Sequence, residues 1–315
     1  MLQAQSTTAV TRCGLRCVSF MKEANQSSSG AHLRCRQIVP SDIDAVIELL
    51  KEGFGSQHSR RFWRRMFAAL ARYPTPAGMP KYGYLLEHAH RPVGVLLLIS
   101  SMAPTQEGWA PRCNVSSWYV KPEFRSYAPL LVKRSISERA VTYINISPAP
   151  HTWSILEAQG YVRYADGLFV SVPMLSAAGP DEARIVPADS EANDFGDQYD
   201  RETLRLHAEF GCTSVWCVTA DGSHPFVFVP RMVWRALPCF QLVYCRSMAE
   251  FVRFARPLGR YLALRGRPTV IVDANGPVAG LVGRYFEDVR PKYFKGTNPP
   301  RLGDLAYTEA SLFGI

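Results

Sequence analysis

The stretch that decides the fold reads Ser116-Ser117-Trp118-Tyr119-Val120-Lys121-Pro122-Glu123-Phe124-Arg125-Ser126-Tyr127-Ala128. It places the end of a strand, a tight loop and the start of a helix within a few residues. Backbone N–H groups at a helix start have no internal partners, and the helix dipole favours negative charge there. The segment therefore predicts a turn that can receive a phosphate.

The flanking sequence predicts the remaining elements of one α/β unit. Before the stretch we expect a strand at 33–39, a helix from Ser41, a helix at 60–72 and a hairpin formed by 82–88 and 92–102. The strand of the stretch itself covers 113–120, and after it we expect a helix at 128–140, a strand at 141–146 and a short helix at 151–159. Ser41 and Asp44 are a predicted capping pair. This order predicts an α/β (α+β) fold, with a mixed, mostly antiparallel sheet and helices on both faces.

The second part of the chain repeats this plan. Ile38-Val39-Pro40-Ser41-Asp42 recurs as Ile185-Val186-Pro187-Ala188-Asp189, again between a short strand and a helix. A strand, a helix and a strand at 240–244, 248–264 and 269–272 mirror those of the first part, which predicts a duplicated domain. The expected division is a disordered leader at 1–30, a first domain at 33–173 and a second, degenerate domain at 182–315.

The central stretch resembles the GCN5-related N-acetyltransferase (GNAT) family of acyl-CoA-dependent transferases. In that family a strand with a Val-x-Pro ending runs into an Arg-or-Gln, x, x, Gly, x, Gly-or-Ala loop that wraps the pyrophosphate of coenzyme A. Val120, Pro122 and Arg125 match this pattern, whereas Ala128 and Leu130 replace the two small turn residues. The resemblance implies a GNAT-like fold whose first domain holds acetyl-CoA or another acyl-CoA as cosubstrate.

The resemblance also implies which residues hold the cofactor. They are Trp118, Tyr119, Val120, Arg125, Ser126, Tyr127, Ala128, Leu130 and Asn145. Asn145 ends the next strand, where the family often has an Asn facing the pantetheine arm, and Gly160-Tyr161 resembles the family's Gly-Phe. Many members carry a Tyr acid four residues before that glycine, but this chain has Leu156. The usual acid for the departing thiolate is therefore missing.

Acyl transfer needs a base for the acceptor and often an acid for the departing sulfur. His151 and Ser117 are the candidate catalytic residues, with Glu157 and Tyr143 nearby; a helix-capping role is the alternative for His151. No cysteine has a nucleophile's context, so we expect the acceptor to attack the thioester directly. The eight cysteines form no CxxC pair, which argues against a zinc site and favours a reducing cytoplasm. No metal is expected.

Two functions fit these features. One is an active acyltransferase that moves an acetyl or other acyl group to an amine or hydroxyl of a small-molecule acceptor. The other is a catalytically inactive, CoA-binding sensor or assembly protein. The formal charge of +9 suits an anionic cofactor, but the basic residues form no recognisable nucleic-acid-binding motif. The longest apolar stretch, 93–99, is too short to span a bilayer, so we expect a cytoplasmic monomer or homodimer without nucleic-acid or membrane partners.

Two further segments each have two interpretations. The helix at 60–72 carries four arginines beside its apolar side, namely Arg60, Arg61, Arg64 and Arg65. They form either a clamp for an anionic substrate or a solvated basic flank of a packed helix. The segment 302–309 offers carboxylates and a phenol. It either reaches an acceptor cleft between the halves or forms a surface strand at the C-terminus.

Overall fold

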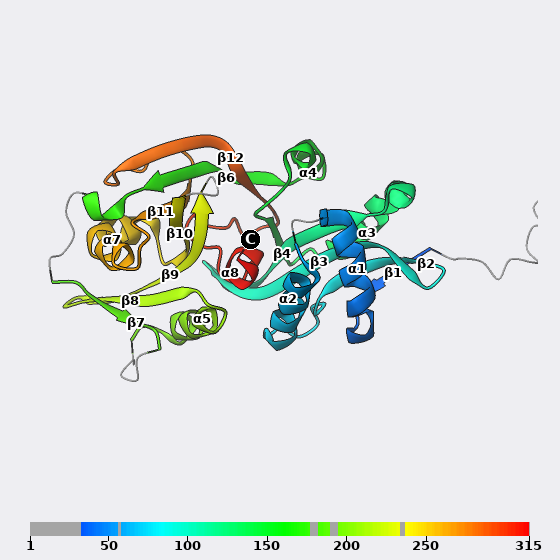
Figure 1. The fold of residues 1–315 in the computed structure, drawn as a ribbon, viewed down its shortest axis with the longest axis horizontal. Coiled ribbons are helices and arrows are strands. Elements are labelled where there is room, and N and C mark those ends of the chain that lie inside the picture. The colour runs from blue at the N-terminus through cyan, green and yellow to red at the C-terminus, as the bar shows by residue number, and fades with distance from the viewer. Residues whose placement is uncertain (1–32, 56–57, 177–181, 190–194, 234–236, 315) are drawn as a thin grey trace, which may run out of the picture.

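The described part of the chain forms one twelve-stranded sheet covered by helices on both faces (Figure 1). This computed structural model describes residues 33–55, 58–176, 182–189, 195–233 and 237–314. The predicted leader at 1–30 lies outside the described residues, as does most of the segment between the two predicted domains.

The strands confirm the predicted mixed, mostly antiparallel sheet. They are β1 (Arg34–Gln37), β2 (Gly83–His88), β3 (Arg91–Thr105), β4 (Gly108–Val120), β5 (Thr142–Asn145), β6 (Val162–Ser171), β7 (Arg184–Pro187), β8 (Thr213–Thr219), β9 (Gly222–Val233), β10 (Leu237–Cys245), β11 (Thr269–Ala274) and β12 (Gly283–Lys295). Their order in the sheet is β1-β2-β3-β4-β5-β12-β6-β11-β10-β9-β8-β7. The pairs β4–β5 and β10–β11 are parallel, and the other described pairs are antiparallel.

This order repeats one plan from each edge of the sheet and exchanges the last strands. The first half of the chain supplies β1 to β5 from one edge, and the second half supplies β7 to β11 from the other. β12 of the second half then pairs with β5, and β6 of the first half pairs with β11. β6 and β12 also pair with each other at the centre. The repeated plan agrees with the predicted duplication, and the halves share one continuous sheet.

Helices cover both faces of this sheet. They are α1 (Ile43–Phe54), α2 (Arg60–Arg72), α3 (Ala128–Ser135), α4 (Trp153–Ala158), α5 (Gln198–Glu209), α6 (Met248–Arg253), α7 (Ala255–Ala263) and α8 (Glu309–Phe313), with 3-10 turns η1 (Pro40–Asp42), η3 (Pro122–Tyr127), η4 (Pro150–Thr152) and η5 (Pro173–Leu175). Leu85 and Val95 pack in a core with α1 and α2, whereas their neighbours Leu86 and Leu96 pack with α3 and α4. The first of these cores extends across both halves to α5 and α8.

Two predicted helices differ from the observed ones. The helix expected at 128–140 ends at Ser135, whose hydroxyl donates to the Leu131 carbonyl at 2.8 Å, a bond that competes with the helix ladder. The helix expected at 248–264 breaks into α6 and α7 at Phe254. Pro257 explains the break, because it lacks the N–H that would bond the carbonyl four residues earlier.

The predicted capping pair of Ser41 and Asp44 is wrong. The chain enters α1 through η1, and the Asp42 carboxylate accepts a hydrogen bond from the Val39 N–H at 2.9 Å. Asp42 is also held by Arg36 of β1, at 2.6 Å. The cap residue is therefore one position away from the predicted one, at the place where β1 can reach it.

Candidate functional site

The first half has an opening where β4 and β5 part. The two strands pair over three residues, from Arg112–Thr142 to Asn114–Ile144. β4 continues to Val120, whereas β5 ends at Asn145. A cavity of about 380 Å³ lies where they separate.

This cavity is lined from both faces of the sheet. Val132 of α3 and Leu156 of α4 line it from one face, and Phe54 of α1 and Trp63 of α2 line it from the other. The parting strands therefore leave an opening that passes through the sheet. Two reactants can meet there after approaching from opposite faces.

A β-bulge in β4 lies at this opening. Ser117 and Trp118 stand opposite the single residue Leu96 of β3, between the pairs Ser116–Leu97 and Tyr119–Val95. Ser117 has a φ of 45°, a left-handed conformation that is unfavourable for a residue with a side chain. Bulges re-aim side chains, and both Ser117 and Trp118 line the cavity. Backbone strain of this kind concentrates at functional sites.

A buried carboxylate also lines the cavity. Glu309, the first residue of α8, is 2% exposed and accepts hydrogen bonds from the hydroxyls of Ser116 and Ser147. The hydroxyl oxygens of Ser116 and Ser117 lie 3.2 Å apart, so polar groups connect Glu309 to the bulge. Burial raises the pKa of Glu309 above its ordinary value. A carboxylate with a raised pKa is a stronger base than an exposed one.

Asn114 links this carboxylate to the point where the strands part. Its side-chain NH₂ donates to the carbonyls of Val115 and Ile144, each at 3.3 Å. Its side-chain oxygen accepts the backbone N–H of Glu309 at 2.8 Å. One buried side chain thus satisfies backbone groups at the split and fixes the start of α8.

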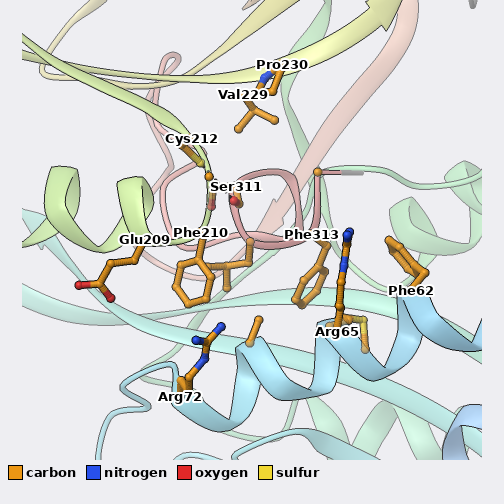
Figure 2. Close-up of a pocket in the computed structure, with 15 residues that line it drawn as sticks. Phe62, Arg65, Arg72, Glu209, Phe210, Cys212, Val229, Pro230, Ser311 and Phe313 are labelled. Carbon is orange, nitrogen blue, oxygen red and sulfur yellow. Dashed lines mark hydrogen bonds between the residues drawn. The ribbon is translucent and has the colours of Figure 1, made fainter. Parts of the chain in front are cut away.

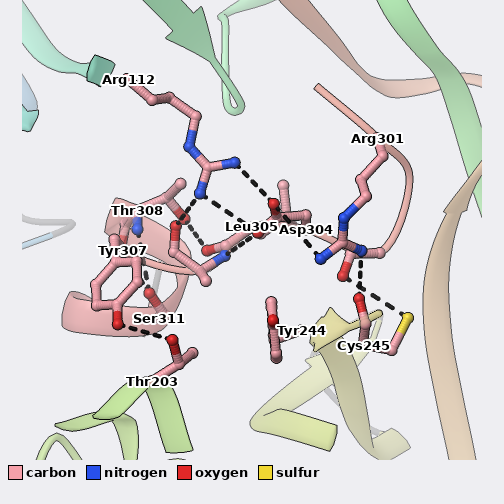
Figure 3. Close-up of polar contacts among 12 residues, drawn as sticks. Arg112, Thr203, Tyr244, Cys245, Arg301, Asp304, Leu305, Tyr307, Thr308 and Ser311 are labelled. Atoms are coloured by element: carbon pink, nitrogen blue, oxygen red, sulfur yellow. Dashed lines mark hydrogen bonds and ion pairs between the residues drawn. The ribbon is translucent and has the colours of Figure 1, made fainter. Parts of the chain in front are cut away.

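The C-terminal segment that carries Glu309 is anchored to both halves (Figure 3). Arg112 of β4 donates to Asp304 at 2.9 Å and to the Ala306 carbonyl at 3.0 Å, and both charged side chains are buried. Burial opposes ionisation of Asp304, but the charges of Arg112 and Arg301 and the hydrogen bonds to Arg112 and the Ala306 N–H together lower the pKa of Asp304. The hydroxyls of Tyr307 and Thr203 of α5 lie 2.8 Å apart. The predicted surface strand at the C-terminus is therefore wrong, because this segment lies inside the molecule.

The same segment closes the matching opening of the second half. β10 and β11 also pair over three residues, and β10 also has a register shift just beyond them, at Leu242–Tyr244. There the Cys245 N–H donates to the Gly303 carbonyl at 3.0 Å, and the Leu305 N–H donates to the Val243 carbonyl at 2.7 Å. The edge of β10 that matches the open edge of β4 is thus occupied by the chain itself.

The structure brings most of the predicted side chains to the cavity. Those that line it are Ser117, Trp118, Tyr119, Arg125, Asn145 and His151. Val120 is buried in the core beside α3. Ser126, Tyr127, Ala128 and Leu130 do not line the cavity, and Tyr127 and Leu130 are exposed.

The predicted tight loop between the end of β4 and Ala128 takes the form of a 3-10 turn. Pro122–Tyr127 form the 3-10 turn η3, which runs into α3, and the Ala128 N–H donates to the Arg125 carbonyl. A 3-10 turn engages its amides three residues apart along the chain, so they are not free for a phosphate. Arg125 itself is exposed, lines the cavity and forms no ion pair with another described residue. Its guanidinium is the group at this end of the cavity that is available for an anion.

Ser116, Ser147 and His58 were not among the predicted site residues, and the segment that contains Glu309 was interpreted either as part of an acceptor cleft or as a surface strand. His58 lines the cavity on the α2 side and stacks on Phe62 at 4.2 Å, and burial lowers its pKa. The pair Ser116-Ser117 at the end of a predicted strand was the only local signal for Ser116. Ser147 and His58 follow no motif.

Four of the five arginines of α2 divide into two pairs, and the fifth, Arg61, is exposed. Arg60 and Arg64 contact the exposed Asp44 at 3.3 and 3.2 Å, which agrees with a solvated basic flank. Arg65 and Arg72 instead line a second hollow of about 330 Å³ between α2, α5 and α8 (Figure 2).

Two kinds of feature are not found among the described residues: a cluster of metal ligands and a helix that could span a membrane. No group of three or more His, Cys, Asp or Glu side chains in the described ranges could hold a metal ion. Within the same part of the chain, every helix is too short or too polar to cross a membrane.

Comparison with known proteins shows which fold this is. No protein-family model and no curated protein matches the sequence. A GCN5-related N-acetyltransferase from Anabaena variabilis ATCC 29413 superposes with a TM-score of 0.55 at 9% identity, over 84% of this chain and 72% of that chain. Its counterpart from Kribbella flavida gives 0.52 at 15% identity, over 84% and 71%.

A third structure, from Pyrococcus horikoshii and described as a candidate acetyltransferase, gives a TM-score of 0.51 at 12% identity, over 90% of this chain and 95% of that chain. Coverage of this extent includes both halves of the molecule. The chain therefore has the fold of the GCN5-related N-acetyltransferases.

Proposed function

We propose that this protein is an acyltransferase that moves an acetyl or other acyl group from coenzyme A to an amine or hydroxyl of a small-molecule acceptor. The observation that carries the proposal is the opening between β4 and β5. There the hydroxyl of Ser116 donates to the buried Glu309 carboxylate and lies beside the hydroxyl of Ser117 in the strained bulge. The N-acetyltransferases that share this fold support the same reaction class.

The acyl-CoA approaches from the face covered by α3 and α4. Arg125 pairs with the diphosphate, because its charge is not taken by another described side chain. Asn145, at the end of β5, and the bulged backbone at Ser117 and Trp118 lie beside the pantetheine arm and the thioester. The degenerate loop is tolerated because a guanidinium side chain replaces backbone amides as the anion contact.

The acceptor approaches from the face covered by α1 and α2. Glu309 removes a proton from the acceptor nitrogen or oxygen, directly or through Ser116, and the freed lone pair attacks the thioester carbonyl carbon. The tetrahedral intermediate collapses, the C–S bond breaks, and the acyl group stays on the acceptor. His151 supplies the proton for the departing sulfur. No cysteine is among the described residues that line this cavity, which supports direct attack.

Only one such opening per chain is available in the described structure, because residues 303–305 occupy the equivalent edge of β10. We therefore propose one acyl-CoA per chain, bound in the first half, although the fold is duplicated.

The binding step is tested by isothermal titration with acetyl-CoA. Arg125→Glu reverses the charge at the proposed diphosphate contact and should weaken binding about tenfold or more. The control is Arg139→Glu, an equal charge change at an exposed position that does not line the cavity. Equal affinities of the two variants would remove Arg125 from the proposed contact.

A second function is favoured by one observation. Leu156 lines the cavity where the family often has its tyrosine acid, so the chain lacks that group. A catalytically inactive CoA-binding sensor or assembly protein would retain acetyl-CoA binding without turnover. Release of free CoA thiol, measured with a panel of amines and hydroxylated acceptors, separates the two functions.

A further inference from the structure

A third hollow lies between the halves and is separate from the proposed transfer cavity. It measures about 680 Å³ and is formed by the segment after α2, by β3 and β4, by α5 and by the C-terminal segment. It shares no lining residue with the cavity between β4 and β5. Nothing in the proposed reaction uses it.

Four aromatic rings form a continuous arc in its wall. Trp109 of β4 contacts Tyr199 of α5 with a ring-centroid distance of 4.9 Å. Tyr199 lies 6.2 Å from Tyr307, which in turn lies 6.0 Å from Tyr73. None of the arginines that lie over aromatic rings in the described structure lies over these four. Arg112 is the cation whose charge acts on Tyr73, Tyr199 and Tyr307, and it is already paired with Asp304.

The charged and polar groups around the hollow also favour a positively charged ligand. Glu202 of α5 lines it, accepts a hydrogen bond from Gln198 at 2.8 Å and forms no ion pair with a described residue. Arg205, which also lines it, forms an ion pair with Glu209. The buried hydroxyl of Tyr199 has no hydrogen-bond partner among the described residues. Carboxylate and hydroxyl oxygens thus accompany the rings, while the nearby arginine is already paired.

We propose that this hollow binds an organic cation, that is, a protonated or quaternary amine with apolar substituents. Aromatic faces attract such cations within about 6 Å of the ring centroid, and the attraction increases when water is excluded. The Glu202 carboxylate adds a Coulomb attraction that an anion would lose and a neutral ligand would not gain. An occupant would also touch Tyr307, two residues before Glu309 in the anchored segment.

The test compares choline with its uncharged isostere 3,3-dimethylbutan-1-ol, by isothermal titration on the full-length chain. The two probes have the same shape and differ in charge. We expect choline to bind about tenfold more tightly than the alcohol. Trp109→Leu and Glu202→Gln should each weaken choline binding about fivefold or more. Both side chains are largely exposed or at the rim, so both variants should fold, which thermal unfolding verifies.

Glu138→Gln is the matched control, because Glu138 is an exposed carboxylate that does not line the hollow. It should leave choline binding unchanged. The proposal is overturned by equal affinities of the two probes, by no binding heat at millimolar choline, or by unchanged choline affinity in Trp109→Leu and Glu202→Gln. The acetyl-CoA titration is independent of all these results, so failure of this site leaves the proposed reaction standing.

Discussion

Replacing Glu309 with Gln tests the proposed base while leaving its surroundings in place. Gln has nearly the same shape, and its carbonyl oxygen can still accept a hydrogen bond from Ser116 or Ser147. Its NH₂ group can donate to the other hydroxyl oxygen. The backbone bond from Glu309 to Asn114 is independent of the side chain. The substitution therefore removes the basicity and little else.

The expected kinetic effect follows from the role of the group. General-base catalysis supplies roughly 10²–10⁴-fold, so kcat/KM should fall by about 10³. The affinity for acetyl-CoA should change by less than about twofold, because Arg125 holds the diphosphate and is unchanged. Since the pKa of Glu309 is raised, the wild-type rate should increase with pH through a value above that of an ordinary glutamate. This limb of the pH profile should be lost in Glu309→Gln.

The effect of Glu309→Gln on the stability of the fold should be opposite to the effect of removing a carboxylate that stabilises the fold when ionised. A carboxyl group whose pKa is raised on folding contributes stability that is present below its unfolded pKa and is lost as pH rises through its folded pKa. At neutral and alkaline pH the ionised Glu309 is therefore unfavourable, and Gln removes that cost. The Tm of Glu309→Gln should equal or exceed that of the wild type under these conditions.

The assay is CoA thiol release over a range of pH, together with thermal unfolding of the same samples. Activity within a factor of about two of the wild type, with the acid limb retained, would refute the role of Glu309 as the base. A large loss of Tm accompanying the loss of activity would assign Glu309 a structural role instead.

Three other substitutions test neighbouring parts of the site. Asp304→Asn leaves the buried Arg112 without its partner and should lower the free energy of unfolding in urea by about 3–5 kcal/mol, whereas Arg112→Met combined with Asp304→Leu should restore much of it. Gly303→Val places a Cβ 2.7 Å from the Cys245 sulfur, at a φ of 77° that a residue with a side chain rarely adopts. It should displace the C-terminal segment and reduce kcat more than it reduces the affinity for acetyl-CoA. An equal loss of kcat and of affinity would contradict this. His151→Ala should lower kcat about tenfold or more without changing acetyl-CoA affinity, and an unchanged kcat would exclude His151 as the acid for the departing sulfur.

Local patterns in the sequence predicted individual elements well. α2 has the predicted bounds, and the predicted hairpin turns at Ala89 and His90, which both have a positive φ as a tight β-turn requires. The exchange of β6 and β12 could not be predicted, because it pairs strands from opposite halves and is decided by the completed sheet. Periodicity within a segment carries no information about such a partner.

The candidate site likewise combines residues that a local motif indicates with residues that only the folded chain brings together. The motif around Ser117 and Arg125 is local, so the sequence indicated Ser117, Trp118, Tyr119 and Arg125, which all line the cavity. The burial of Glu309 depends on contacts such as Arg112 with Asp304, which are 192 positions apart, and no local pattern indicates them. The predicted loop is the 3-10 turn η3, and Ala128, which stands where the family has a glycine, is the first residue of α3.

The location of bound coenzyme A tests the central claim most directly. We predict that a crystal structure of the complex will show one CoA per chain, with its diphosphate at Arg125 and its sulfur beside Ser117 in the opening between β4 and β5. CoA bound at β10 of the second half, or an opening that stays empty at saturating CoA, would contradict the claim.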